Sequence, residues 1–182
     1  MAIIKGAKIA KRVITLLIIL AVIIVGYKFL TNEPGIKPIT ENIIKLRITE
    51  NPLDKAKIIS STDNMITKLE SDEVKERWNQ LTKCLNKECS DTQYFNFLII
   101  LFSQYPEKLA KTDLLLKILA IQRYWGTEEV VEFSKAMSYV DEEIQKMPSN
   151  TVKKKWQNVI DCNNLCDKKN DYFLELIQSV LN

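Results

Sequence analysis

Apolar residues recur along most of this chain at spacings of three and four, which places them on one face of an α-helix. The clearest stripe joins six positions, which are expected to face a core: Val130, Phe133, Met137, Val140, Ile144 and Met147. Comparable stripes predict helices at residues 39–47, 49–69, 72–85, 94–105, 114–125, 130–147, 152–159 and 170–180. No segment of any length alternates apolar and polar residues as a half-buried strand does. We therefore expect an all-α fold.

Much of the segment from Asp63 to Phe95 is written a second time from Asp141 to Phe173. The positions that recur with the same residue type are Asp63, Ile66, Lys68, Ser71, Val74, Lys75, Trp78, Cys84, Tyr94, Phe95, Leu98 and Ile99. Trp and Cys are rare residues, so chance is a poor explanation, and a fixed period indicates repeated structural units. We expect two tandem four-helix repeats of about 78 residues, stacked as a helical-repeat domain in the manner of a solenoid. Residues that pair in the register of Asp63 with Asp141 are called equivalent below.

Residues near the helix ends predict where some helices begin and end. Thr49 is expected to cap the second helix, and Thr127 occupies the equivalent position in the second copy. Ser90 and Gln93 have the spacing of a capping box, in which each residue hydrogen-bonds the other's backbone N–H. Pro106 should end the apolar helix that precedes it.

The N-terminal part of the chain has a different pattern. Residues Val13–Tyr27 contain no charged side chain, and eleven of these fifteen residues are Val, Ile or Leu. Those eleven favour insertion into a membrane by roughly 3 to 7 kcal/mol. A helix extended to Leu30 would be about 27 Å long, close to the hydrocarbon thickness of about 30 Å. We therefore predict a transmembrane anchor, Val13–Leu30, whose partner is the lipid bilayer.

The charges on either side of this segment predict its orientation. Four cationic residues precede Val13, whereas only Lys28 follows directly after Tyr27. The positive-inside rule then places the N-terminus in the cytoplasm and the C-terminal domain outside it, in a periplasm or at the cell exterior. A cleaved signal peptide is the alternative, since it also has a charged start and a short apolar core. No A-x-A-like cleavage site follows the core, which favours the uncleaved anchor.

These patterns divide the chain into five parts. Residues 1–12 form a basic cytoplasmic N-terminus, and residues 13–30 form the anchor. Residues 31–38 contain two prolines and a glycine, which predict a short non-helical neck. Residues 39–105 and 106–182 form the two helical repeats.

Composition narrows the possible function classes. The 182 residues carry a net charge of +3, of which +5 lies in residues 1–30, so the rest of the chain carries −2. A weakly acidic body lacks the basic patch of a nucleic-acid-binding protein, and we expect no nucleic-acid partner. The chain has no histidine, only four glycines and no recognisable nucleophile motif. We therefore predict that it is not an enzyme, with no catalytic residue, metal ligand or cofactor.

The four cysteines form two close pairs, Cys84 with Cys89 and Cys162 with Cys166, each between the third and fourth helices of its repeat. Such short separations are compatible with local disulfides, which persist outside the cytoplasm. Three other arrangements stay open: a four-cysteine zinc site, a redox-active dithiol and bonds between the two repeats. Neither pair has the C-x-x-C spacing typical of zinc knuckles and thioredoxin-like motifs. We therefore favour two internal structural disulfides.

Four aromatic residues occupy equivalent positions in the two copies: Trp78 with Trp156, and Phe95 with Phe173. Aromatic side chains also anchor interfaces and line ligand-binding grooves. At this helical spacing they are more typical of a packed core. We assign all four to the cores of the repeats.

The predicted function is that of a single-pass, membrane-anchored protein whose helical domain binds an unidentified protein outside the cytoplasm. It would act as an adaptor or as an accessory subunit of an envelope complex, because stacked helical repeats present extended concave surfaces. The alternative from another class is a cysteine-based thiol–disulfide or metal-binding protein. The redox state of the four cysteines separates the two hypotheses.

Overall fold

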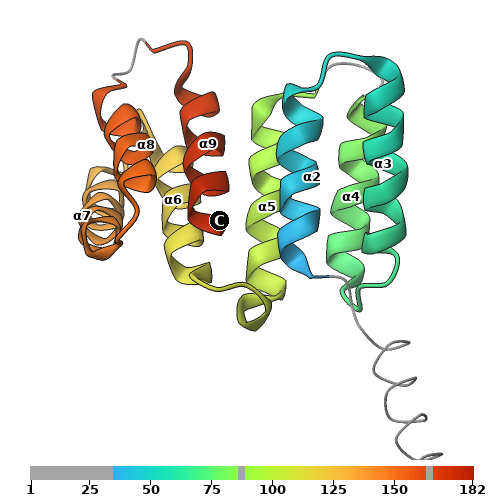
Figure 1. Ribbon diagram of the computed structural model, residues 1–182, viewed down its shortest axis with the longest axis horizontal. Helices are drawn as coiled ribbons and strands as arrows, with labels where there is room; N and C mark the ends of the chain where they lie inside the picture. The colour runs from blue at the N-terminus through green and yellow to red at the C-terminus, as the bar shows by residue number, and fades with distance from the viewer. Residues whose placement is uncertain (1–34, 86–88, 163–165) are drawn as a thin grey trace, which may run out of the picture. The chain divides into compact units, whose positions relative to one another are not determined.

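The computed structural model describes residues 35–85, 89–162 and 166–182 (Figure 1). These residues form eight α-helices and contain no β-strand, so the predicted all-α class is confirmed. The helices are α2 (Ile36–Ile48), α3 (Pro52–Ile66), α4 (Asp72–Leu85), α5 (Asp91–Gln104), α6 (Thr112–Tyr124), α7 (Val130–Lys146), α8 (Asn150–Asp161) and α9 (Lys169–Leu181). A short 3₁₀ helix, η1 (Pro106–Lys108), connects α5 to α6.

The predicted anchor at residues 13–30 and the basic segment before it lie outside the described residues. Within the described ranges, no helix is both long enough and apolar enough to cross a bilayer. The chain from Pro34 to Asn182 makes up one unit, separate from the residues before it.

The first two helices begin at other residues than the sequence predicts. Helix α2 starts at Ile36 rather than at residue 39, so part of the predicted neck is helical. Pro38 is tolerated there because the N–H groups of the first turn have no acceptor within the helix. Helix α3 is capped by Asn51, whose side chain accepts from the Leu53 and Asp54 N–H groups. Thr49 instead ends α2, where its hydroxyl donates to the Lys45 carbonyl at 2.7 Å.

The other predicted helix signals agree better with the structure. The capping box of Ser90 and Gln93 opens α5. Helix α5 ends at Gln104, and Pro106 begins η1. In contrast, Thr127 is not the cap of α7, because Glu129 holds the N-cap position; the Thr127 hydroxyl accepts from the Glu129 N–H at 3.4 Å before the helix begins.

Four helices form the centre of the body. Helix α2 packs on α5 and α9, and α6 packs on the same two helices, which closes a ring of four (Figure 1). Helices α3 and α4 cover the α2/α5 side of this ring, and α7 and α8 cover the α6/α9 side. The body therefore consists of four two-helix layers, which Figure 1 shows side by side.

The first and last described helices are in contact, because α2 packs against α9 as well as against α5. The two halves of the body therefore meet along their inner helices. The apolar faces of the inner helices cause this contact, because each of them is covered only when the two halves of the body meet. That the halves are two stacked repeats stays a prediction.

The core runs through all four layers. Many side chains of the inner layers are completely buried, and the aliphatic ones include Ile39, Ile43, Leu98, Leu101, Ile118, Leu119, Leu176 and Ile177. Full burial of one such side chain contributes roughly 1.5 to 3 kcal/mol. The bulkiest buried side chains are aromatic and include Phe97 and Phe102 of α5.

Candidate interaction surface at the disulfide end

The helices of the body meet at two ends. The C-terminal ends of α2, α4, α6 and α8 and the N-terminal ends of α3, α5, α7 and α9 gather at one of them, which we call the disulfide end (Figure 1). The opposite end holds Gly35, where the described chain begins, and η1. At that opposite end the Lys111 ammonium donates to the Val180 carbonyl at 3.4 Å.

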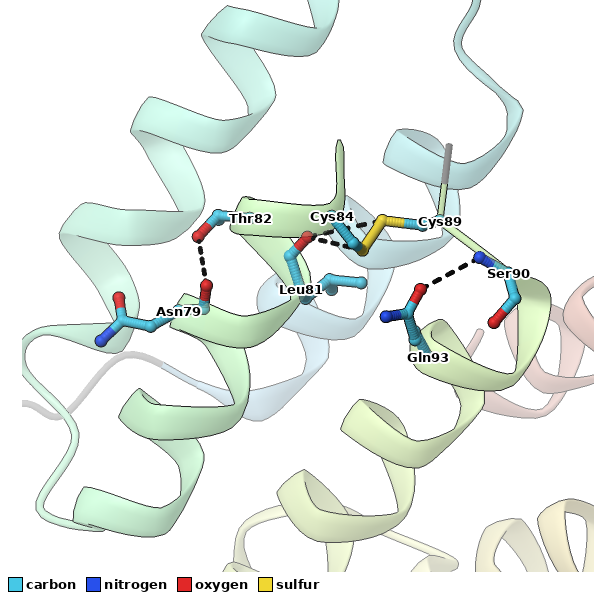
Figure 2. The surroundings of a disulfide bond; sticks show 7 residues. All are labelled: Asn79, Leu81, Thr82, Cys84, Cys89, Ser90 and Gln93. Atoms are coloured by element: carbon cyan, nitrogen blue, oxygen red, sulfur yellow. Dashed lines mark hydrogen bonds between the residues drawn. A yellow bond between two sulfur atoms is a disulfide. The ribbon is translucent and has the colours of Figure 1, made fainter. Parts of the chain in front are cut away.

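Both cysteine pairs join the end of one helix to the start of the next. Cys84 lies in the last turn of α4, and its sulfur is at disulfide distance from that of Cys89, just before the α5 cap (Figure 2). Cys162 is in the same relation to Cys166 between α8 and α9. The Cα atoms are 5.1 Å apart in the first pair and 5.4 Å in the second. Both pairs therefore lie within their own half of the body.

The surroundings of Cys84 and Cys89 fix the start of α5. The Leu81 carbonyl oxygen lies 2.9 Å from the Cys84 sulfur. A disulfide sulfur carries no proton, so this is a packing contact rather than a hydrogen bond. The Ser90 N–H donates to the Gln93 Oε1 atom at 3.0 Å, so helix α5 begins directly after the covalent link (Figure 2).

A polar network joins the two halves at the disulfide end. Arg47, in the last turn of α2, forms a salt bridge with Asp91 at the start of α5. Asn170 of α9 donates to the same carboxylate at 2.8 Å, and Gln122 of α6 donates to Asn170 at 3.2 Å. The guanidinium also lies 4.0 Å from Asp171. All four inner helices therefore contribute a side chain to this network.

The network shifts the ionisation of its members. Partial burial raises the pKa of Asp91, but the hydrogen bonds from Arg47 and Asn170 and the positive charge of Arg47 outweigh it. The net pKa of Asp91 lies below its ordinary value. The hydrogen bond to Asp91 is the main reason why the pKa of Arg47 is raised. The pair is therefore charged across the physiological pH range.

The four aromatic residues predicted for the core are all buried, at 2 % exposure or less. The Trp78 indole N–H donates to the Asp63 carboxylate at 3.1 Å, and the Trp156 indole donates to Asp141 at 2.8 Å. The first bond joins α4 to α3, and the second joins α8 to α7. These two tryptophans thus have a structural contact rather than an open ligand site.

The stripe on α7 is only partly covered, contrary to expectation. Val140 and Ile144 are completely buried, but Val130 is 64 % exposed. The N-terminal half of α3 is similar, because Leu53 is 74 % exposed whereas Ile66 is buried. The first turns of both helices therefore hold apolar side chains away from the core.

No family model, curated protein or solved structure matches this chain. The function must therefore be argued from the chemistry of its residues. Within the described residues, no group of three or more Cys, Asp or Glu side chains is arranged to hold a metal ion.

An apolar groove opens at the disulfide end of the second half, and we call it the α7 groove. It has a volume of about 450 Å³ and is lined by Tyr124, Trp125, Gly126, Thr127, Val130, Phe133, Met137, Ile160 and Cys162. Gly126, at φ +79°, turns the chain between α6 and α7. The Trp125 ring packs edge-on against Phe133 and Phe173. Its buried N–H has no hydrogen-bond acceptor among the described residues.

The sequence patterns predict neither this groove nor the polar network. The groove is built from the part of the α7 stripe that was expected in the core. A signal was present in the sequence, because the positions equivalent to Phe133 and Trp125 in the first copy hold Lys55 and Arg47. Positions that are buried in the core of both copies would be apolar in both. A helix face that is charged in one copy and apolar in the other does not have this pattern.

Proposed function

We propose that this protein is a single-pass, membrane-anchored extracytoplasmic protein that acts as a non-enzymatic adaptor or as an accessory subunit of an envelope complex. Its anchor is the segment at residues 13–30, which is free of charge from Val13 to Tyr27 and is preceded by four cationic side chains. The two cysteine pairs at disulfide distance suit an oxidising compartment. The partner is a protein that docks on the disulfide end.

The observation that carries this proposal is the position of the exposed apolar side chains. The described residues hold six large apolar side chains that are well exposed, and five of them lie at the disulfide end: Ile48, Leu53, Val130, Val131 and Ile160. Exposed apolar surface of this kind marks protein-binding sites in soluble domains. The described residues begin at Gly35, directly before α2, at the end of the body opposite to these side chains.

We also propose that the helical body arose by duplication of one four-helix unit. The indole–carboxylate bonds of Trp78 and Trp156 support this, because donor and acceptor occupy equivalent positions in the two copies. The hydroxyls of Ser71 and Ser149, another equivalent pair, both accept from the N–H three positions later. The two cysteine pairs follow at the same junction in each half.

Site-specific photo-crosslinking in native membranes tests the adaptor function. A photoreactive amino acid at Leu53, which is 74 % exposed, should capture one discrete protein. The matched control is the same probe at Glu107, an exposed residue in η1 at the opposite end, which should not capture it. Capture of the same proteins from both positions, or of none from either, would contradict docking at the disulfide end.

Protease added to right-side-out membranes tests the topology in the same preparation. The helical body should be digested without lysis, because the positive-inside rule places it outside the cytoplasm. Protection before lysis and digestion after it would show the opposite orientation.

A further inference from the structure

The α7 groove has an internal control in the first half of the body. The positions equivalent to its lining residues Trp125, Phe133 and Ile160 are occupied by Arg47, Lys55 and Thr82. In the first half, Arg47 and Lys55 line a polar depression beside Asp91 and Cys89. The first half therefore has charged and polar side chains where the groove has apolar ones. Trp125 and Phe133 also pack against the core, whereas Ile160 is exposed and contributes little to it.

The groove continues onto exposed surface at the start of α7. Val130 and Val131 are each 64 % exposed, and Ile160 at the end of α8 is 40 % exposed. Val130 and Ile160 line the groove, whose volume is about 450 Å³, and Val131 extends the apolar surface beyond that lining. A small molecule in the groove would leave Val131 in water, whereas a polypeptide segment would cover the groove and Val131 together.

The exposed charged residues that adjoin the groove lining in sequence are mainly acidic. Glu128 and Glu129 lie between the lining residues Thr127 and Val130, and Asp161 follows Ile160. Among the cations, Arg123 precedes Tyr124, and Lys135 forms a salt bridge with Glu132. The charge that adjoins the apolar lining is therefore negative, and we call Glu128, Glu129 and Asp161 the rim.

From this combination, we propose that the α7 groove binds a short segment of the partner protein in which a bulky apolar side chain is flanked by Lys or Arg. The apolar side chain enters between Val130 and Ile160 and contacts Phe133 and Met137. The flanking cations lie over the rim carboxylates, where charge complementarity favours them. This inference rests on the proposed adaptor function and names the chemistry of its partner.

The acidic rim disfavours two other occupants. A second copy of this chain bound through the same groove would place the rim carboxylates of the two copies against each other, which is destabilising. An anionic lipid surface carries the same sign of charge as the rim and would repel it. A peptide with an apolar side chain next to basic ones complements both the apolar lining of the groove and the rim carboxylates.

Selection from a library of random displayed peptides tests this proposal with the full-length protein in mild detergent. The enriched peptides should share an aromatic or large aliphatic residue next to Lys or Arg. A fluorescently labelled enriched peptide then provides the probe for affinity measurements by fluorescence anisotropy. Its binding should also shift the emission of Trp125, because that indole lines the groove, whereas Trp78 and Trp156 are buried elsewhere.

Substitutions in the groove and a matched control further along α7 make the test specific. Val130→Glu and Ile160→Glu should each weaken peptide binding at least tenfold. The double charge reversal Glu128→Lys/Glu129→Lys should weaken it at least threefold. Tyr139→Glu is the control, because Tyr139 is an exposed apolar side chain of the same helix that lies outside the groove. The affinity of this control variant should match that of the wild type.

Several results would overturn the proposal. They are an equal loss of affinity in Tyr139→Glu, enrichment of acidic peptides, or enrichment of no peptide at all. Self-association in sedimentation that Ile160→Glu abolishes would show that a second copy occupies the groove. Binding to phosphatidylglycerol vesicles that Ile160→Glu abolishes would show a lipid surface instead.

The proposed adaptor function and the proposed peptide binding by the α7 groove can fail separately. If Leu53 captures a protein in membranes but no peptide binds the groove, the groove inference is wrong and the adaptor function stands. If peptides bind the groove but neither crosslinking position captures a protein, the adaptor function is wrong as proposed.

Discussion

In the first half of the body, residues 35–105, the Trp78 indole donates to Asp63 on the preceding helix. In the second half, residues 106–182, Trp156 makes the same bond with Asp141. The disulfide ends of the two halves differ, because Arg47 is bound to Asp91 in one, whereas Trp125 packs on Phe133 in the other. The contacts within the two outer layers are thus alike, whereas the ends of the helices at the disulfide end differ between the halves.

The largest predicted effect concerns the contacts that the halves share. Trp78→Ala and Trp156→Ala should each lower the free energy of unfolding by about 3 to 5 kcal/mol, because each removes a buried ring and leaves a cavity. Both losses should be similar, since both rings are at most 2 % exposed and bonded alike. Denaturant unfolding followed by circular dichroism measures them.

Substitution of each tryptophan by phenylalanine separates the contribution of the buried ring to stability from that of the indole hydrogen bond. Trp78→Phe and Trp156→Phe keep an aromatic ring but lose the indole donor, and each should cost about 1 to 2 kcal/mol. A loss confined to one half would break the equivalence of the two tryptophans.

Loss of a disulfide should have the next largest effect on stability, and the effect should be equal for the two disulfides. Replacing both cysteines of a pair with serine, at Cys84 and Cys89 or at Cys162 and Cys166, should cost about 2 kcal/mol, because each bond closes a short loop. The fold should persist, since its core packs independently of these links. Thermal melts of the two double variants provide the measurement.

Peptide mapping under non-reducing conditions shows which cysteines are bonded to each other, and that prediction depends on this pairing. Each half should give its own cross-linked fragment, and loss of one pair should leave the other intact. A fragment that joins Cys84 or Cys89 to Cys162 or Cys166 would contradict internal pairing. Four free thiols in protein from its native compartment would contradict the extracytoplasmic location too.

The polar network should have a smaller effect that depends on pH. Asp91→Asn should cost about 1 to 2 kcal/mol at neutral pH, because it removes a half-buried charge that holds Arg47 and Asn170. The pKa of Asp91 is lower in the folded protein than its ordinary value of 3.8. Its stabilisation is therefore present above that value and is lost as the pH falls towards the folded pKa.

Unfolding measured from neutral to strongly acidic pH tests this dependence. The difference in stability between the wild type and Asp91→Asn should be constant above about pH 5 and should shrink below about pH 4. Asp72→Asn is the matched control, because the Asp72 side chain is 98 % exposed and pairs with nearby Lys75. A difference that persists unchanged at the acidic end would show that the carboxylate charge is not its cause.

The sequence predicts most of the fold because helical periodicity is a local signal. The apolar stripes locate all eight helices of the described residues, and the capping box at Ser90 places the start of α5. Errors at the ends have local causes too. Pro38 fits inside the first turn of α2, and Asn51 competes successfully with Thr49 as the cap of α3.

The candidate site could be predicted only in part, because it depends on contacts between distant residues. The cysteine pairs are close in sequence, and the structure brings each to disulfide distance. The bond from Asn170 to Asp91 joins two halves of the chain, and no periodicity indicates it. Likewise, the stripe on α7 does not reveal that Val140 is covered while Val130 stays in solvent. Periodicity shows on which face of a helix a side chain lies. It does not show how many turns of that face a neighbouring helix covers.

The smallest predicted effect is also the sharpest test of the difference between the two halves. Val130→Ala should change the free energy of unfolding by no more than about 0.5 kcal/mol, because that side chain is 64 % exposed. Val140→Ala on the same helix should cost roughly 1 to 3 kcal/mol, because Val140 is completely buried and its loss leaves a cavity. Denaturant unfolding of the two variants compares one substitution in two environments. Equal losses would mean that the start of α7 is packed like its end, and the α7 groove would then be part of the core rather than a docking surface.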